Sequence, residues 1–205
     1  INYGINMTQK FETKDVNLSG YISVDYYHTG FQNQIFPDYD SDPTIAIIKN
    51  FTGTSVSNGF QAEVYLKMWE RVEVKTGYTY LDVYREVTEE NELLPFNPKH
   101  KILTTFSFAP LSNRYHFDVN MHWYGEQRLP DTKSNPAEFQ RPDFSEPYTV
   151  VSAQLTYTFG AFEVYGGCEN IFDFRQLQPI ISWQDPFSPY FDTSSVWGPT
   201  RGREI

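Results

Sequence analysis

Three aspartates at alternate positions, Asp38, Asp40 and Asp42, form the clearest metal-ligand pattern in the sequence. Their spacing matches the first ligands of a calcium-binding loop between two helices. Pro43 stands where such a loop needs a glycine, and no glutamate follows at the position of the bidentate ligand. We therefore expect a solvated acidic loop and keep the three carboxylates only as weak calcium candidates. We predict neither a resident metal nor a cofactor.

The histidines are the next residues that could support chemistry. His116 and His122 lie in one strand-like segment, where six residues separate them by roughly 20 Å, too far to share an ion. His100 ends the stretch "NPKH" at an expected junction of loop and strand, but the sequence offers no Ser or Asp partner for a hydrolase site. Gly198 and Gly202 lead towards a strand and not a helix, so they do not form a phosphate cradle. We predict no catalytic residue, and an outer-membrane hydrolase using His100 is the least favoured alternative.

Aromatic and hydrogen-bonding side chains gather instead in the long connections between the expected strands. Flat apolar faces mixed with a few donors are typical of ligand pockets, and loops on a rigid scaffold commonly carry recognition. The alternative is that these side chains only pack on one another. The predicted ligand contacts are Tyr84, Arg85, Tyr124, Gln127, Arg128, Trp183 and Tyr190, with Arg141 and Trp197 beside them.

Composition narrows the class of protein. The 205 residues carry a net charge of -10, without the clustered Lys and Arg that phosphate binding requires, so we expect no nucleic-acid partner. Aromatics make up 18% of the chain, a high share that favours pleated sheets. The single Cys168 cannot form an internal disulfide. No signal peptide opens the chain, and residue 1 is expected to be an internal position of a longer protein.

Alternation of apolar and polar residues predicts strands. Segment 115–124 places Tyr115, Phe117, Val119, Met121 and Trp123 on one face and polar side chains on the other. The same split occurs in 18–26, 60–68 and 151–159, and less cleanly in 3–11, 72–80, 102–108 and 162–168. Segment 44–69 is long enough to cross a membrane and project beyond it. The sequence therefore predicts about eight strands.

The connections distinguish between two all-β architectures. Short links at 14–15, 70–71, 110–113 and 160–161 take turns with long ones at 38–43, 86–99, 127–146 and 173–199. This rhythm is typical of outer-membrane barrels, whose turns are short on one side and loops long on the other. Trp69, Phe108, Trp123 and Phe159 then fit an aromatic girdle at the membrane interfaces. Alternation alone leaves a rival open, a soluble β-sandwich that binds glycans.

A resemblance favours the barrel. "GGCENIFD", followed by a long loop and "GPTRGRE", resembles the end of the barrel of TonB-dependent outer-membrane receptors. In that family an Asn-Leu-Phe-Asp-like quartet closes the penultimate strand. "LSGYISVDYYHTGFQNQIFPD", "NGFQAEVYLK", "VKTGYTYLD", "LPFNPKHK" and "YGEQRLPD" are similar, in this order, to preceding strands and loops of the family, particularly of its Bacteroidetes-type members. The resemblance spans essentially the whole chain.

The resemblance implies an all-β fold, an antiparallel transmembrane β-barrel. Residues 1–205 would be its C-terminal portion, about eight complete strands plus a stub of the last strand of a 22-stranded barrel. The plug domain and the upstream strands would be absent from this chain. Residues 170–173 would lie where the penultimate strand leaves the membrane, and residues 201–203 would lead into the final strand.

The resemblance also implies a function. The parent protein would be an active-transport receptor in the outer membrane of a Gram-negative bacterium, and not an enzyme. It would bind a scarce solute of the siderophore, cobalamin or oligosaccharide class at its external loops. The implied partners are the TonB complex through the plug region, the remaining strands of the same barrel, membrane lipid and the ligand. A surface lipoprotein over the mouth is left open.

Overall fold

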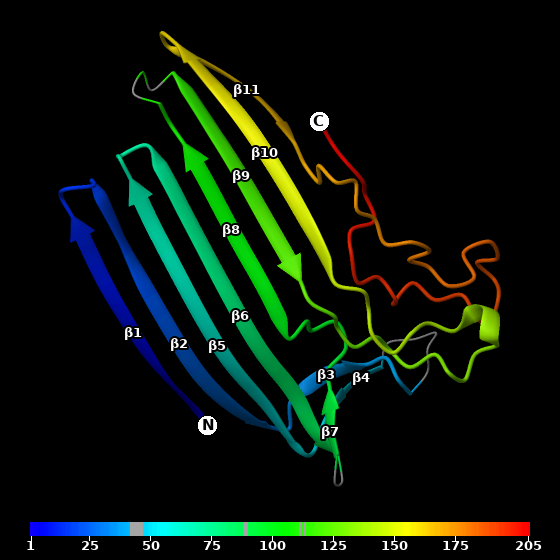
Figure 1. Ribbon diagram of the computed structural model, residues 1–205. Coiled ribbons are helices and arrows are strands. Elements are labelled where there is room, and N and C mark those ends of the chain that lie inside the picture. Colours follow the sequence, from blue (N-terminus) through cyan, green and yellow to red (C-terminus); the bar gives the residue numbers. More distant parts are fainter. Residues whose placement is uncertain (42–46, 88–89, 111, 113) are drawn as a thin grey trace.

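The computed structural model describes residues 1–41, 47–87, 90–110, 112 and 114–205. One antiparallel sheet dominates it and curves through the whole molecule, as Figure 1 shows. Its eight main strands follow one another in chain order: β1 (Asn2–Thr13), β2 (Leu18–Gln32), β5 (Thr54–Met68), β6 (Val72–Val87), β8 (His100–Phe108), β9 (Tyr115–Tyr124), β10 (Tyr148–Phe159) and β11 (Phe162–Cys168). Within the described ranges, no helix is long and apolar enough to cross a membrane.

Three short strands and a single-turn helix lie at one end of this sheet. β7 (Glu90–Leu93) pairs with the end of β6, and β3 (Ile35–Asp38) pairs with β4 (Ile47–Asn50) in a separate hairpin. The 3-10 helix η1 (Ala137–Phe139) belongs to the connection between β9 and β10. These additions lie beside the long loops in Figure 1.

The strand register explains why the sheet has one apolar face. Each pair of neighbouring strands sets apolar residues opposite apolar residues, as where Phe117 faces Phe108 on one side and Leu155 on the other. Val64 likewise faces Ile22 of β2. Because side chains alternate between faces, a shift of one residue in the pairing register of a strand would move its apolar side chains to the polar face. The predicted strands are confirmed, and the structure extends most of them at the ends.

Short turns and long loops occupy opposite ends of the sheet, as the loop rhythm predicts (Figure 1). The short turns join β1 to β2, β5 to β6, β8 to β9 and β10 to β11. Asn17, Trp69, Glu70 and Gly160 take positive φ angles in these turns. The molecule therefore has a short-turn end and a long-loop end.

The apolar face of the sheet is not covered by a second sheet in the described part of the chain. Tyr115, Phe117 and Leu155 on this face are 48%, 38% and 50% exposed. Among the residues with described burial, the buried apolar ones are Phe36, Val56, Leu129 and Ile181, and all four lie at the long-loop end. A β-sandwich would bury its apolar face in a core. The sandwich alternative is therefore wrong for this chain.

Segment 44–69 differs from the prediction of one continuous strand. Residues 44–46 lie outside the described residues, β4 covers 47–50, and β5 begins at Thr54. β4 leaves the main sheet because it pairs with β3, with Ile35 opposite Asn50 and Asp38 opposite Ile47. The crossing strand is therefore β5, and the preceding residues belong to a hairpin at the long-loop end.

Candidate ligand-binding surface at the long-loop end

The polar face of the sheet carries a network of charged and hydrogen-bonding side chains. Glu63 accepts a hydrogen bond from Tyr21 at 2.6 Å and lies 3.0 Å from the ammonium of Lys75. Asp118 accepts a hydrogen bond from Ser107 at 2.6 Å and lies 3.0 Å from the ring of His116. His116 thus takes part in the hydrogen bonding of this face.

A shallow groove follows this polar face towards the long loops. Its lower hollow, of about 210 Å³, lies over β6, β8 and β9, where Gly77 leaves open space and Lys101, His122 and Tyr124 form part of the wall. A second hollow of about 240 Å³ is lined by Leu81, Val83, Leu93, Leu94, Asn97, Lys99, His100, Glu126, Arg128 and Phe144. Both hollows border β6 and β8, and the second one reaches the long loops at Asn97, Glu126 and Phe144. The two hollows are together called the groove.

Five rings form an aromatic stack beside this groove: His122, Tyr124, Tyr148, Phe174 and Trp197. The register sets Tyr148 of β10 opposite Tyr124 of β9, with ring centroids 5.0 Å apart. Phe174 stacks on Tyr148 at 5.0 Å with planes only 3° apart. Trp197 lies 5.7 Å from Tyr148 and 6.3 Å from Phe174. The rings remain half-buried, so the stack keeps accessible edges and faces.

Two buried amides hold the last loop against the aromatic stack. Gln127 donates from its side chain to the carbonyl oxygen of Trp197 at 2.9 Å. The side-chain oxygen of Gln176 accepts the backbone N–H groups of Trp197 and Gly198 at 2.8 and 3.0 Å, and its amide donates to the carbonyl oxygen of Ser195 at 2.8 Å. Both amides are nearly fully buried, so their bonds are costly to break.

An ion network joins the loops on the other side of the groove. Arg85 of β6 forms two hydrogen bonds with Glu92, at 2.8 and 2.9 Å, and its guanidinium lies 4.3 Å from the ring centre of Phe36. Arg128 bridges Asp40 at 3.0 Å and Glu92 at 3.5 Å. The hydrogen bonds from Arg85 lower the pKa of the Glu92 carboxyl, although burial opposes this. The network thus ties the first three long loops together.

The acidic loop with the weak calcium candidates was predicted to be solvated, but Asp38 is buried and Asp40 is paired with Arg128 in the same network, so that prediction is wrong for these two residues. Burial disfavours the charge of Asp38, but hydrogen bonds from Lys49, Ser41 and the Asp40 N–H outweigh it and hold the pKa of that carboxyl well below its usual range. Asp40 binds Arg128, and Asp42 lies outside the described residues. Among the residues that the structure describes, no group of three or more His, Cys, Asp or Glu is arranged to hold a metal.

The predicted ligand contacts have different environments in the structure. Arg85, Gln127 and Arg128 are committed to the contacts described above. Tyr124 belongs to the aromatic stack, and Trp183 is 60% exposed. The other three predicted residues are placed as follows: Tyr84 lies opposite Val56 and Leu93, Tyr190 stacks on Phe139 at 5.1 Å, and Arg141 donates to the carbonyl oxygen of Gln178 at 3.2 Å. The structure therefore brings Tyr124 and Trp197 together and leaves Trp183 apart from them.

Sequence reasoning missed Tyr148, Phe174 and Gln176. Tyr148 opens a strand and Phe174 follows the Asn-Ile-Phe-Asp quartet, and neither has a local pattern that marks it as a site residue. Register and loop folding bring them together. Only the pairing of β9 with β10 could have indicated that Tyr148 faces Tyr124.

His100 has a structural environment. Its Nδ1 atom lies 2.8 Å from the hydroxyl of Tyr78, and its ring centroid lies 5.2 Å from that of Tyr80. The backbone oxygen of His100 accepts the N–H of Gly125. These contacts occupy Nδ1, one ring face and the backbone oxygen of His100.

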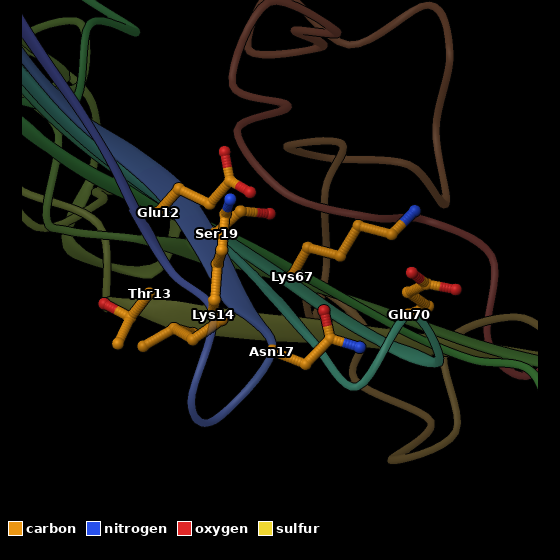
Figure 2. Close-up of a pocket in the computed structure, with 8 residues that line it drawn as sticks. Glu12, Thr13, Lys14, Asn17, Ser19, Lys67 and Glu70 are labelled. Atoms are coloured by element: carbon orange, nitrogen blue, oxygen red, sulfur yellow. The ribbon is translucent and has the colours of Figure 1, made fainter.

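A further hollow, of about 730 Å³, lies at the short-turn end (Figure 2). Glu12 and Ser19 come from the first hairpin, and Lys67 and Glu70 come from the next one, as Figure 2 shows. Lys67 is paired with Glu73 at 2.9 Å. This hollow is polar and lies far from the aromatic stack along the strands, so it is not part of the same surface.

The quartet at residues 170–173 fastens the last loop to the end of β11. Asn170 is 6% exposed, and its side-chain amide donates to the carbonyl oxygens of Phe174 at 2.8 Å and Arg201 at 3.3 Å. Asp173 accepts the N–H of Arg203 at 2.8 Å. Glu169 and Glu204 then form an antiparallel bridge. Glu204 therefore lies beside the end of β11 through a single bridge, and residues 201–203 lead up to it.

Comparisons with known proteins agree with this architecture. Residues 2–171 match the family model described as TonB dependent receptor-like, beta-barrel. No curated protein sequence matches the chain.

Three solved structures illustrate the likeness. The ferric-catecholate import receptor Fiu of E. coli K12 is 15% identical with a TM-score of 0.64, over 98% of this chain and 26% of that one. The ferripyoverdine receptor of Pseudomonas aeruginosa is 19% identical with a TM-score of 0.56, over 84% and 23%. The FrpB iron transporter of Neisseria meningitidis is 8% identical with a TM-score of 0.59, over 98% and 30%.

The chain thus spans less than a third of the length of these structures, and at such identities the likeness shows the fold alone. The family match covers most of the chain and agrees with the exposed apolar face and the single antiparallel sheet. This protein therefore belongs to the TonB-dependent receptor β-barrel family, whose members lie in the outer membrane of Gram-negative bacteria.

Proposed function

We propose that the parent protein is an outer-membrane receptor that binds a scarce solute at its external loops and imports it with energy from the TonB complex. The observation that carries this proposal is the family match over residues 2–171 on a sheet with one polar and one lipid-compatible face. The solved relatives include a ferric-catecholate import receptor, a ferric citrate transporter and a copper transporter. The proposed solute belongs to the siderophore, cobalamin or oligosaccharide class.

The chain then forms the C-terminal part of the barrel. The outer edges of β1 and β11 would carry unpaired backbone groups in lipid, which the hydrocarbon region does not tolerate. We propose that the remaining strands of the same barrel pair with these edges, and that a plug inside the barrel contacts the TonB complex. A surface lipoprotein above the loops is a further candidate partner. Transport needs no covalent chemistry, so we propose no enzymatic activity.

The external loops supply the proposed binding surface. Tyr124, Tyr148 and Trp197 offer rings beside the groove, and Trp183 offers an exposed ring on the last loop. Tyr84, Arg85, Gln127, Arg128 and Tyr190 remain proposed contacts, although the two arginines and Gln127 already serve loop contacts. Rigid loops of this kind present a largely preformed surface, which lowers the entropic cost of binding.

Uptake measured in cells tests this function. Cells that produce the full-length receptor should take up its solute saturably, and deletion of TonB should abolish the uptake while leaving surface binding intact. Uptake that continues unchanged without TonB would contradict the proposal. A receptor lacking residues 174–199 serves as a second arm, because it should lose binding while the barrel remains in the membrane.

A further inference from the structure

The apolar face of the sheet becomes polar near the long-loop end. One row across neighbouring strands is aromatic and consists of Tyr26 of β2, Phe60 of β5 and Tyr80 of β6. The next row on the same face lies two residues further along each strand, towards the long loops. It is called the polar row and consists of His28, Asn58 and Asp82.

The polar row continues the surface that contacts lipid. Tyr26 and Phe60 of the adjoining aromatic row are 41% and 37% exposed. Aromatic side chains of outer-membrane barrels gather at the level where the hydrocarbon meets the headgroups, and two further residues advance the strand by about 7 Å. The polar row therefore lies at the level of the lipid headgroups. It faces the outer leaflet, because the long loops of such barrels are extracellular.

Two histidine rings are held in fixed positions at this level. His28 stacks on Tyr3 with ring centroids 4.8 Å apart, and its Nδ1 atom lies 2.7 Å from the side-chain oxygen of Asn58. His100 lies on β8 at the end of the aromatic row, and its Nδ1 atom lies 2.8 Å from the hydroxyl of Tyr78. Within the described part of the chain, the Nε2 atom of neither ring has a hydrogen-bond partner. A protonated imidazole donates from both nitrogens, so each ring can keep its present contact and donate from Nε2.

The charged groups of the polar row leave donors available for a ligand. Asp82 is the only carboxylate of the row, and the ammonium of Lys99 lies 2.8 Å from its Oδ1 atom. This ion pair lacks hydrogen-bond geometry, since the same Oδ1 atom has no hydrogen-bond partner among the described residues. The N–H groups of Lys99 are thus left for another acceptor, and its side chain is 38% exposed. A phosphate group, with its strong acceptor oxygens, complements such a set of donors.

The spacing of the donors indicates the form of the ligand. His28 and His100 lie three strand spacings apart, across β2, β5, β6 and β8 (Figure 1). Neighbouring strands are about 4.8 Å apart and the two histidines differ by one row, so their separation is roughly 15 Å. One phosphate cannot reach both rings, whereas a disaccharide with a phosphate at each end can span them. Lys99 precedes His100 in the chain and adds a positive charge at that end.

We propose that the polar row, together with Lys99 and His100, binds the bisphosphorylated sugar headgroup of a glycolipid in the outer leaflet. Lys99 and His100 donate to one phosphate, and His28 donates to the other. The apolar face below them contacts the acyl chains, so one continuous surface binds headgroup and chains. This inference goes beyond the proposed transport function and does not depend on the solute. It rests on the family membership, which places the sheet in the outer membrane.

Lipid binding to the full-length receptor in detergent, measured by native mass spectrometry over a series of lipid concentrations, tests the proposal. The probes are bisphosphorylated lipid A, the same lipid without its phosphates, phosphatidylglycerol, and inorganic phosphate as a competitor. We expect the bisphosphorylated lipid to bind at least about tenfold more tightly than the dephosphorylated one, the effect of one charge-assisted hydrogen bond or more. Equal affinities of these two lipids, or tighter binding of phosphatidylglycerol, would overturn the inference. Displacement of the lipid by an equal concentration of inorganic phosphate would assign the site to a free anion and overturn it as well.

Three double variants localise the site. Lys99→Gln/His100→Leu should bind the bisphosphorylated lipid about tenfold more weakly and the dephosphorylated lipid unchanged, a difference that a general loss of structure would not produce. Lys67→Gln/His116→Leu is the matched control, because it removes the same residue types, also paired with carboxylates, from the polar face, and it should change neither affinity. Lys99→Arg/His100→Arg keeps donors at both positions and should retain the affinity. Weaker binding by this third variant, equal losses in the first variant and the control, or an equal loss for both lipids would contradict the assigned site.

Discussion

The side-chain amide of Asn170 donates a hydrogen bond to the carbonyl oxygen of Arg201, 31 residues further along the chain, at 3.3 Å. The same amide donates to Phe174, and its oxygen accepts the Phe174 N–H at 3.1 Å. One buried side chain thus shapes the start of the last loop and holds its end. The long loop can vary between these points while the entry to the next strand stays fixed beside β11.

Replacing Asn170 with Ala should destabilise the barrel. The change leaves buried backbone groups without partners, and the expected loss is about 1 to 3 kcal/mol. Urea unfolding of the full-length receptor in detergent, followed by tryptophan fluorescence, measures it. Asn97→Ala is the control, because Asn97 is exposed and bonds only to the nearby Pro95 carbonyl. Equal midpoints for the two variants would count against a fastening role for Asn170.

Gly202→Ala should disturb the same contact by a different mechanism. A Cβ atom at this position would lie 2.1 Å from a carboxylate oxygen of Asp173 and 2.7 Å from Nε of Arg175. The displaced carboxylate would lose its bond to the Arg203 N–H, and overpacking of this kind costs about 1 to 3 kcal/mol. Gly166→Ala, where a Cβ atom meets nothing within 4 Å, should be nearly neutral in the same unfolding assay. A stable Gly202→Ala protein with intact bridging at Glu204 contradicts the prediction.

The ion network of the loops should weaken in acid. The folded-state pKa values of Asp38 and Glu92 are both lowered, so their stabilising effect is present above the unfolded values of about 4. It is lost as the pH falls through the folded values, because the protonated carboxyls no longer attract Lys49 and Arg85. Hydrogen exchange, corrected for its intrinsic pH dependence, should show less protection of segment 125–133 below about pH 4 than at pH 7.

A charge variant separates this effect from general acid unfolding. Arg85→Gln removes the two hydrogen bonds from Arg85 to Glu92, leaves Glu92 with only the 3.5 Å contact to Arg128, and should lower the protection of the same segment already at pH 7. The strands β5 and β6 below the loops should keep their protection in both experiments. Protection of the loops that is identical in Arg85→Gln and the unaltered protein would show that the network does not hold them.

A charge on the apolar face should cost more than one on the polar face. Val119 lies in the middle of this face, opposite Phe106 and Ala153, and its neighbour Asn120 points to the other side. Arg at the lipid-facing midplane of a barrel costs about 2 to 4 kcal/mol. Val119→Arg should therefore lower the unfolding midpoint in lipid bilayers, while Asn120→Arg should change it little. A larger loss for Asn120→Arg than for Val119→Arg would mean that lipid contacts the polar face, and it would contradict the assignment.

Local patterns predicted the scaffold better than the binding surface. Strands such as 115–124 are visible because one face meets lipid and the other meets polar groups, which fixes a period of two. The contact between Arg128 and Asp40 joins residues 88 positions apart, so no local pattern could indicate it. The hairpin of β3 and β4 was missed because its strands have only four residues each. Tyr148, Phe174 and Trp197 meet only through register and loop folding.

Accessibility of single labels along β9 tests most directly whether the apolar face contacts lipid. Spin labels are placed one at a time at residues 116–121 of the full-length receptor in bilayers, in a Cys168→Ala background. The account predicts that oxygen dissolved in the lipid relaxes labels at positions 117, 119 and 121 most strongly, and that labels at 116, 118 and 120 do not share this access. Labels at 117, 119 and 121 that are shielded from lipid, as under a second protein layer, would contradict it.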